Sequence, residues 1–257
     1  MAETWRKTWQ SDVGTAMALV YFKRATGELP EMESSKAAAA RLKPHLRAND
    51  KLLDVGCGAG HYLRSVKSAI TVPFTYRGID ATPTFVDFAK KAFAGDATVS
   101  FQQGDIFSLP FEDRSFDVVM SNNLLLHLPS IEKPIQELCR VARRRVLIRT
   151  LIGDRSFRVQ EVIEGEDGLE RFHPDGEPAE FNFYSVYGKP YVERILRGIP
   201  AVKSFKLETD TDFDPARIEA SVAEFEGHPS ATRMLGEWQR NGYILQPWTF
   251  VHIEIGH

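Results

Sequence analysis

The residues best suited to binding a ligand lie in the segment KLLDVGCGAGHYL, residues 51–63. Its first part is apolar and too short for a helix, which predicts a buried strand. Gly56, Gly58 and Gly60 then alternate along the chain, which predicts a turn whose backbone can approach a ligand closely. A helix follows, and its first N–H groups would point at whatever lies over the turn. A polar ligand is therefore expected at the carboxyl end of this strand.

The glycine spacing departs from the dinucleotide-binding fingerprint G-x-G-x-x-G, because the third glycine, Gly60, comes one residue early. Asp54 precedes the first glycine by two residues, and the resulting D-x-G-x-G-x-G pattern resembles the first motif of the class I S-adenosylmethionine-dependent methyltransferases. S-adenosylmethionine has no pyrophosphate, but it carries an ammonium group that a strand-end carboxylate and backbone carbonyls can hold. On this segment alone, a nucleotide-binding oxidoreductase and a plain tight turn remain alternatives.

A second strand is predicted at residues 74–80 and ends in Asp80, 20 residues after Gly60. A carboxylate at this position is placed to hydrogen-bond a ribose diol, which NAD and S-adenosylmethionine both contain. The alternative is that Asp80 caps the next helix, because Asp80-Ala81-Thr82-Pro83 is typical of a helix start. Both interpretations hold together if Thr82 is the capping residue.

A third strand is predicted at residues 98–103 and leads into Gly104-Asp105-Ile106. This segment resembles the third motif of the same family, which implies that Asp105 binds the adenine amine and that Ile106 packs on the ring. The alternative is a turn aspartate followed by a core isoleucine. The wording LPFEDRSFDVV at residues 109–119 also resembles this family and precedes a fourth strand, predicted at residues 116–121.

The loop at residues 122–129 follows the fourth strand, so it should face the same cleft. Amine-modifying relatives often carry an Asn/Asp-Pro-Pro-aromatic tetrapeptide here, and its absence weakens a prediction of adenine or glutamine N-methylation. His127 is the leading candidate for a catalytic base, which is needed only if the acceptor must lose a proton. The alternative is a histidine that caps the following turn.

The resemblance implies a cofactor site for S-adenosyl-L-methionine, with S-adenosyl-L-homocysteine as the product. Its expected residues are Asp54, Gly56, Cys57, Gly58, Gly60, Asp80, Ala81, Gly104, Asp105, Ile106 and Asn122. No Cys/His cluster has the spacing of a metal site, so no metal is expected.

Five alternations of strand and helix predict an α/β fold with a parallel, doubly wound sheet. The resemblance implies a Rossmann-like sheet of about seven strands, the last one antiparallel. Candidates for the final two strands are residues 201–208 and 247–255. The triplet Arg143-Arg144-Arg145 is expected in a solvated loop before the fifth strand, on the face opposite the cleft, and a nucleic-acid-binding patch is the alternative.

Residues 1–47 are predicted as an N-terminal helical segment, with helices over residues 5–26 and 36–42. In this family such a segment often folds over the cofactor as a lid, and the alternative is a helix that covers a sheet edge. The methyltransferase domain is predicted at residues 48–257. It should carry helical, substrate-side insertions at about 153–191 and 212–241.

The first of these insertions is dense in aromatic residues. Tyr184, Tyr187 and Tyr191 follow the fifth strand, so they are candidates for the wall of an acceptor pocket. Packing in the core is an equally good interpretation of the same residues. His173 is a weaker candidate for chemistry.

The composition is ordinary for a globular protein, with 43% hydrophobic and 26% charged residues. A net charge of −3 argues against a broad nucleic-acid-binding face. The chain shows no secretory signal or membrane span, and its two cysteines fit a reducing, cytoplasmic location.

The sequence therefore predicts a methyltransferase that transfers a methyl group to oxygen or nitrogen of a small-molecule acceptor. A non-catalytic protein that binds the same cofactor, a protein or nucleic-acid methyltransferase and, least of all, a dehydrogenase are the alternatives. Whether the chain is a monomer or a homodimer stays open.

Overall fold

The computed structural model describes residues 12–165, 167–211 and 248–256, with the backbone alone at 12–15. It also describes the backbone of three short strands that form a small antiparallel sheet, β10 (Arg233–Leu235), β11 (Trp238–Asn241) and β12 (Ile244–Leu245). None of the described helices is long and apolar enough to cross a membrane.

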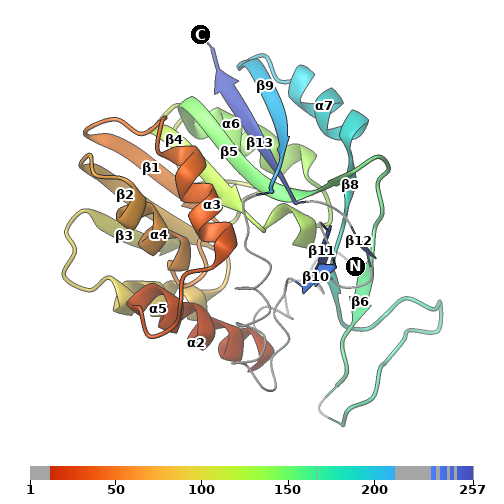
Figure 1. Ribbon diagram of the computed structural model, residues 1–257. Coiled ribbons are helices and arrows are strands. Elements are labelled where there is room, and N and C mark those ends of the chain that lie inside the picture. The colour runs from red at the N-terminus through yellow and green to blue at the C-terminus, as the bar shows by residue number, and fades with distance from the viewer. Residues whose placement is uncertain are drawn as a thin grey trace.

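A central sheet organises the described chain (Figure 1) and has the order β3-β2-β1-β4-β5-β13-β9, with β8 paired to the end of β5. Its strands are β1 (Asp50–Val55), β2 (Phe74–Asp80), β3 (Val99–Gln103), β4 (Phe116–Asn122), β5 (Ala142–Gly153), β8 (Tyr187–Gly188), β9 (Val202–Thr209) and β13 (Trp248–Ile255). The first five strands are parallel, and β13 runs antiparallel to both of its neighbours. The predicted α/β, doubly wound sheet with an antiparallel last strand is confirmed.

Helices cover both faces of this sheet (Figure 1). They are α2 (Asp12–Thr26), α3 (Glu33–Leu42), α4 (His61–Ala69), α5 (Pro83–Ala92), α6 (Glu132–Val141) and α7 (Lys189–Arg197), with a short 3-10 helix, η1, at Leu125–His127. Helix α2 contacts α4 and α5, and α3 contacts α4, whereas α6 contacts α7, β4 and β5. The helices predicted at residues 5–26 and 36–42 are confirmed over residues 12–26 and 36–42, and the second helix begins earlier, at Glu33. Residues 5–11 of the first prediction lie outside the described chain.

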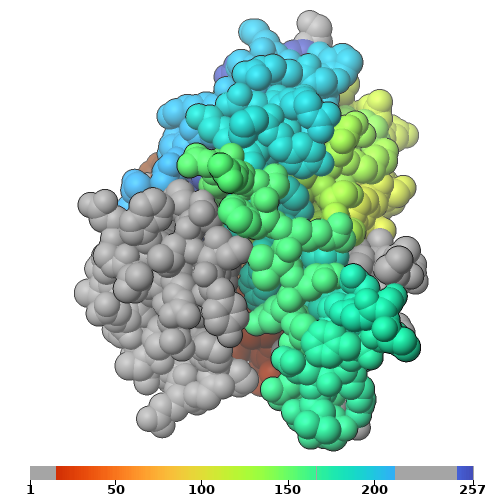
Figure 2. All heavy atoms as spheres, turned by 90° about the vertical axis from the view of Figure 1, so that its right-hand side faces the viewer, coloured from red at the N-terminus to blue at the C-terminus, as the bar shows by residue number. Residues whose placement is uncertain are grey.

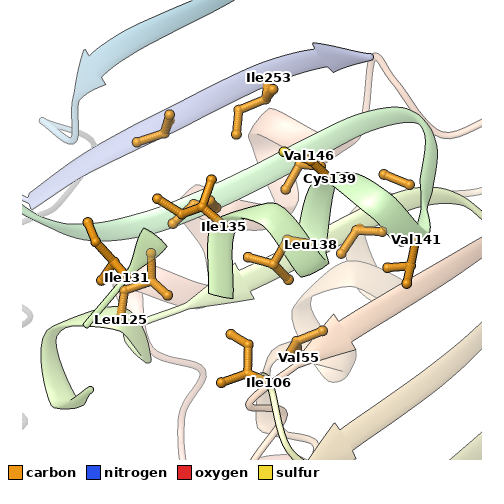
Figure 3. Close-up of a cluster of buried hydrophobic side chains, with 14 of the residues drawn as sticks. Val55, Ile106, Leu125, Ile131, Ile135, Leu138, Cys139, Val141, Val146 and Ile253 are labelled. Atoms are coloured by element: carbon orange, nitrogen blue, oxygen red, sulfur yellow. The ribbon is translucent and has the colours of Figure 1, made fainter. Parts of the chain in front are cut away.

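Two apolar cores lie on opposite faces of the sheet because neighbouring residues of a strand point to opposite sides. Leu53 and Val119 belong to the core beneath α6 and α7, and their neighbours Leu52 and Val118 belong to the core beneath α3 and α4. Figure 3 shows the first of these cores. Continuous apolar runs are what a parallel sheet covered on both faces requires.

The insertions differ from the helical prediction. Residues 153–188 form a β-hairpin arm in which β6 (Gln160–Val162) pairs with β7 (Phe181–Phe183), and helix α7 begins only at Lys189. Phe181 and Phe183 are both buried, so the pattern has the period of a strand. Figure 2 shows this insertion (green to teal) projecting below α7 (cyan).

In the second insertion, residues 233–235 and 238–241 are strands, so the helical prediction is wrong there as well. The remaining residues of the predicted 212–241 insertion lie outside the described chain.

The arginine triplet also differs from its prediction, because β5 already begins at Ala142. Arg143 pairs with Asp117 at 2.8 Å, Arg144 with Asp50 at 2.5 Å and Arg145 with Glu254 at 2.7 Å. The three guanidinium groups therefore pair with carboxylates on β4, β1 and β13, and they do not lie in a solvated loop.

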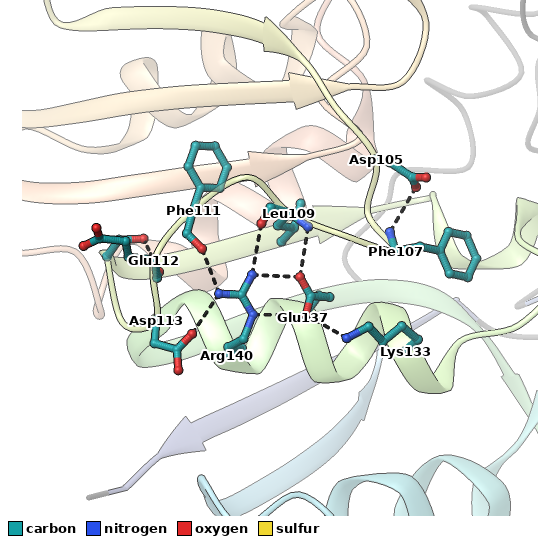
Figure 4. Close-up of polar contacts among 10 residues, drawn as sticks. Asp105, Phe107, Leu109, Phe111, Glu112, Asp113, Lys133, Glu137 and Arg140 are labelled. Carbon is teal, nitrogen blue, oxygen red and sulfur yellow. Dashed lines mark hydrogen bonds and ion pairs between the residues drawn. The ribbon is translucent and has the colours of Figure 1, made fainter.

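An ion pair within α6 fastens the long connection between β3 and β4 (Figure 4). Arg140 donates to the carbonyls of Phe111 at 2.7 Å and Leu109 at 3.0 Å, and it pairs with Glu137 at 2.8 Å. Glu137 in turn accepts the N–H of Leu109 at 2.9 Å. Hydrogen bonds from Arg140 and Lys133 outweigh burial and lower the pKa of Glu137 to about 2.

The first prediction concerns Glu137. Glu137→Gln should lower the free energy of unfolding at pH 7 by about 2 kcal/mol, because bonds to a charged group contribute roughly 1.5–3 kcal/mol. The pKa of the native carboxylate is depressed, so its contribution is present above the unfolded pKa of about 4.3 and lost as pH falls through about 2. Urea unfolding at several pH values measures both effects.

The exposed Glu112 in the same connection is the matched control. Glu112→Gln should change stability by less than about 0.5 kcal/mol. Equal losses for the two variants at pH 7 would contradict the role assigned to Glu137.

Candidate functional site

The glycine turn after β1 forms as predicted. Gly56, Gly58 and Gly60 have φ values of 78°, 52° and 81°, in the left-handed region that favours glycine. A Cβ atom on Gly56 would lie 2.7 Å from Cδ2 of Leu124, so this turn and the loop after β4 are in close contact. The turn and that loop therefore form one wall at the carboxyl edge of the sheet.

Asp80, at the end of β2, holds the turn in place. Its Oδ2 accepts the N–H of Gly58 at 2.9 Å, and its Oδ1 accepts the N–H of Thr82 at 2.9 Å. Burial raises the pKa of Asp80, and these N–H groups oppose that shift. Thr82 is the N-cap residue of α5 but makes no capping bond through its side chain. Each carboxylate oxygen has capacity for a second bond, so a diol could still be bound.

Asp54 lies beneath the turn and is buried. Its carboxylate accepts a hydrogen bond from the hydroxyl of Tyr76 at 2.7 Å. Burial and the charge of Asp80 raise the pKa of Asp54 to about 7, although the Tyr76 bond opposes this shift. The two carboxylates are therefore neighbours. Cys57 is buried beside them, and burial raises the pKa of its thiol.

The end of β3 lies against the end of β2, since the N–H of Gly104 donates to the carbonyl of Asp80 at 2.9 Å. A Cβ atom on Gly104 would lie 2.3 Å from Cδ1 of Ile79, so this approach requires glycine. Asp105 is half-buried and accepts the N–H of Phe107 at 3.0 Å (Figure 4).

The surroundings of two predicted cofactor residues, Ile106 and Ala81, differ from those of Asp80 and Asp54 at the turn. Ile106 is buried in the core beside Val55 (Figure 3), so its side chain serves the core. Ala81 is exposed, and its carbonyl accepts a bond from Gln103 at 3.1 Å.

Asn122, the last residue of β4, is only 7% exposed, yet neither its amide oxygen nor its amide nitrogen has a hydrogen-bond partner. A buried polar group left in this state costs about 1–3 kcal/mol and calls for an explanation. Its position at the carboxyl end of a parallel strand is where open α/β sheets bind ligands. The role of Asn122 as a cofactor residue stays a prediction, and its unpartnered amide is consistent with that role.

His127 belongs to η1, and its Nδ1 lies 2.9 Å from the carbonyl oxygen of Phe183 in the insertion. A carbonyl only accepts, so Nδ1 carries the hydrogen and, in the neutral ring, Nε2 carries the lone pair. Burial lowers the pKa of His127 to about 4, which keeps the ring neutral at pH 7. The ring is thus oriented by the insertion and has the protonation state of a base.

The structure separates the three candidate tyrosines. The ring of Tyr184 stands edge-on to His127, with ring centroids 5.0 Å apart. Tyr187 is buried, and its hydroxyl donates to the carbonyls of Leu125 and Leu128, which supports the loop that carries His127. Tyr191 stacks on Tyr187 with a centroid distance of 6.3 Å. Only Tyr184 directly neighbours the candidate base.

Sequence reasoning missed Tyr21 and His61. Tyr21, in α2, stacks on the ring of His61 with centroids 4.2 Å apart and planes 14° apart. A Cβ atom on Gly58 would lie 3.6 Å from Tyr21, so α2 reaches the glycine turn. This contact supports the lid interpretation of the N-terminal segment. The only available signal was the apolar stripe of α2, which does not single out Tyr21.

A partly buried chain of hydrogen bonds joins the N-terminal segment to the loop after β4 and to β5. Tyr62 donates to Ser34 at 2.9 Å and accepts from Asn123 at 3.1 Å, and Asn123 accepts from Arg149 at 2.6 Å. Arg149 then pairs with Asp210 at 2.8 Å, and both side chains are 3% exposed or less. This chain fixes the loop that follows Asn122.

Comparison with known proteins agrees with this architecture. Residues 53–148 match the family model described as "Methyltransferase domain". Ajmaline N-methyltransferase of Rauvolfia serpentina is 32% identical over 58% of this chain and 43% of its own length. The 27-O-demethylrifamycin SV methyltransferase of Amycolatopsis mediterranei is 38% identical over 38% of this chain and 36% of its own length. The chain spans about half or less of the length of the curated relatives it matches.

Among solved structures, phosphoethanolamine N-methyltransferase 2 of Haemonchus contortus, in complex with phosphomonomethylethanolamine and S-adenosylhomocysteine, superimposes with a TM-score of 0.61. It is 16% identical, and the match covers 98% of this chain and 59% of that one, which shows a shared fold. Residues 53–148 therefore match a methyltransferase domain, and the resemblance to the class I S-adenosylmethionine-dependent methyltransferases seen in the sequence is confirmed.

The second prediction concerns the buried pair Arg149–Asp210. Arg149→Met leaves the Asp210 carboxylate buried without its cation, so it should lower the free energy of unfolding by about 3–5 kcal/mol. Arg143→Met is the control, because the half-exposed pair with Asp117 should contribute about 0–1 kcal/mol. Urea unfolding of both variants measures the difference, and similar losses would refute the special role of Arg149.

Proposed function

We propose that the chain is an S-adenosylmethionine-dependent methyltransferase that acts on a small-molecule acceptor. The observation that carries the proposal is the edge formed by Asp80, Asp54 and Asn122 around the glycine turn, where the buried amide of Asn122 has no partner of its own. The family match supports the same cofactor.

The bound cofactor supplies an activated methyl group on a sulfonium, with a neutral leaving group. The task of the protein is then to hold and align the reactants. Asp80 provides acceptors for a ribose diol, and Asp105 is a candidate acceptor for the adenine amine. The N–H groups at the start of α4 provide positive potential next to the turn.

On the acceptor side, His127 is the base we propose for a hydroxyl acceptor. The bond from Nδ1 to Phe183 leaves the Nε2 lone pair as the basic site of the neutral ring. Tyr184 is the proposed substrate contact beside it, since the two rings touch edge to face. The names of the relatives that act on ajmaline and demethylrifamycin favour small acceptors.

A protein or nucleic-acid methyltransferase remains the weaker alternative. The net charge is −3, and the arginine triplet of β5 is engaged in ion pairs. Cys57 and Cys139 are free, buried thiols, which fits the proposed reducing, cytoplasmic location.

The third prediction tests cofactor binding by titration calorimetry with S-adenosylhomocysteine. Asp80→Ala should weaken binding about 10- to 100-fold, as expected when bonds to a charged group are removed. Asp87→Ala, at an exposed position of α5, should bind like the unchanged protein. Lack of binding by the unchanged protein, or full binding by a folded Asp80→Ala variant, would contradict the proposed function.

The fourth prediction concerns the pH dependence of methyl transfer to a hydroxyl acceptor. His127 acts as a base only when neutral, so the rate should stay high down to about pH 5 and fall as pH drops through about 4. His127→Gln should lower kcat about 10²- to 10⁴-fold and leave cofactor affinity unchanged. Release of S-adenosylhomocysteine across a panel of phenols, alcohols and amines measures the rate. An unchanged kcat with every hydroxyl acceptor would exclude His127 as the base.

A further inference from the structure

We propose that His61 binds the carboxylate of the cofactor's amino-acid end through Nδ1–H, and that Tyr21 holds its ring in place. This inference rests on the function proposed above and adds a binding residue that neither the motif nor the family match assigns. Three observations support it. His61 lies next to the glycine turn, its Nδ1 has no hydrogen-bond partner, and the N-terminus of α4, which it occupies, has no side-chain cap.

His61 is the first residue of α4 and is 9% exposed. Its Nδ1 is buried and has no hydrogen-bond partner. A Cβ atom on Gly58 would lie 3.3 Å from Cε1 and 3.5 Å from Nδ1 of His61. This edge of the imidazole therefore faces the glycine turn. A buried nitrogen that faces a ligand-binding turn has a ready explanation if a ligand group completes its bond.

The start of α4 favours an anionic group at this point. The N-cap residue is Gly60, which has no side chain to cap the helix, and the first turn contains no acidic residue. The first N–H groups of a helix lack intrahelical partners and carry partial positive charge. A carboxylate bound there would accept from these groups and from Nδ1–H of His61, whereas an ammonium group would be repelled by the helix end.

The surroundings of the ring keep it neutral and fixed. Burial and, to a smaller extent, the charge of Arg24 lower the pKa of His61 to about 3. Tyr21 stacks on one face at 4.2 Å, and Tyr62 meets the ring edge-on at 5.0 Å. His61 is therefore a positioned hydrogen-bond donor, and the N-terminal helix that carries Tyr21 takes part in cofactor binding through it.

Two variants separate the hydrogen bond from the stack. His61→Phe keeps an aromatic ring for Tyr21 and removes Nδ1, whereas His61→Asn places an amide near the position of Nδ1 and removes the stack. Titration calorimetry is carried out with S-adenosylhomocysteine and with 5′-methylthioadenosine, which lacks the amino-acid end. Thermal unfolding confirms that each variant is folded.

His61→Phe should weaken S-adenosylhomocysteine binding about 10- to 100-fold and leave 5′-methylthioadenosine binding unchanged. His61→Asn should recover part of the loss for S-adenosylhomocysteine. The proposal is overturned if folded His61→Phe binds both compounds like the unchanged protein, or if it loses affinity for both equally. If the unchanged protein binds neither compound, the proposed function itself fails, so the two failures are distinguishable.

Discussion

The hydrogen bonds made by Asp80 hold the ends of three strands together. Its carboxylate accepts the N–H of Gly58 after β1 and of Thr82 before α5, and its carbonyl accepts the N–H of Gly104 after β3. Burial raises the pKa of this carboxylate, which means that removing its charged form from water costs free energy. Asp80 thus accepts hydrogen bonds from the glycine turn, from the start of α5 and from the end of β3, and these three bonds fix the shape of the site.

Local sequence signals were sufficient for the sheet and for most of this edge. The strands β1, β2 and β3 are short apolar runs, and each is followed by or ends in glycine or aspartate. Strand formation by apolar runs and chain turning at glycine or aspartate both depend on only a few neighbouring residues. The insertion could not be predicted in the same way. Phe181 and Phe183 alternate as in a strand, but a short aromatic run fits a helix equally well until its pairing with Gln160–Val162 is known.

The remaining features that could not be predicted from the sequence depend on contacts between residues far apart in the chain. Arg149 meets Asn123 and Asp210, which are 26 and 61 residues away, and Tyr62 meets Ser34 across 28 residues. No periodicity marks such partners. The two apolar cores account for the sheet and its helices, whereas this polar chain links α3, through Ser34, to α4 and to the loop after β4. The lid role of the N-terminal segment stays a prediction, but the contacts that position this segment arise only in the fold.

Most of the described buried polar side chains that lack a hydrogen-bond partner lie at the carboxyl edge of the central sheet. Ser121 donates to the carbonyl of Val55, so burial near the turn does not in itself prevent pairing. The described side chains with a buried atom that has no partner are His61, Asn122, Thr150, Asn182, Trp248 and His252. All but His252, which faces Glu208 at 3.6 Å, lie at or beyond the carboxyl ends of β1, β4 and β5. Buried polar atoms without a partner in the protein are expected at functional sites, because a bound ligand can supply the missing hydrogen bond. These unpartnered atoms therefore support the ligand site that we propose at this edge of the sheet.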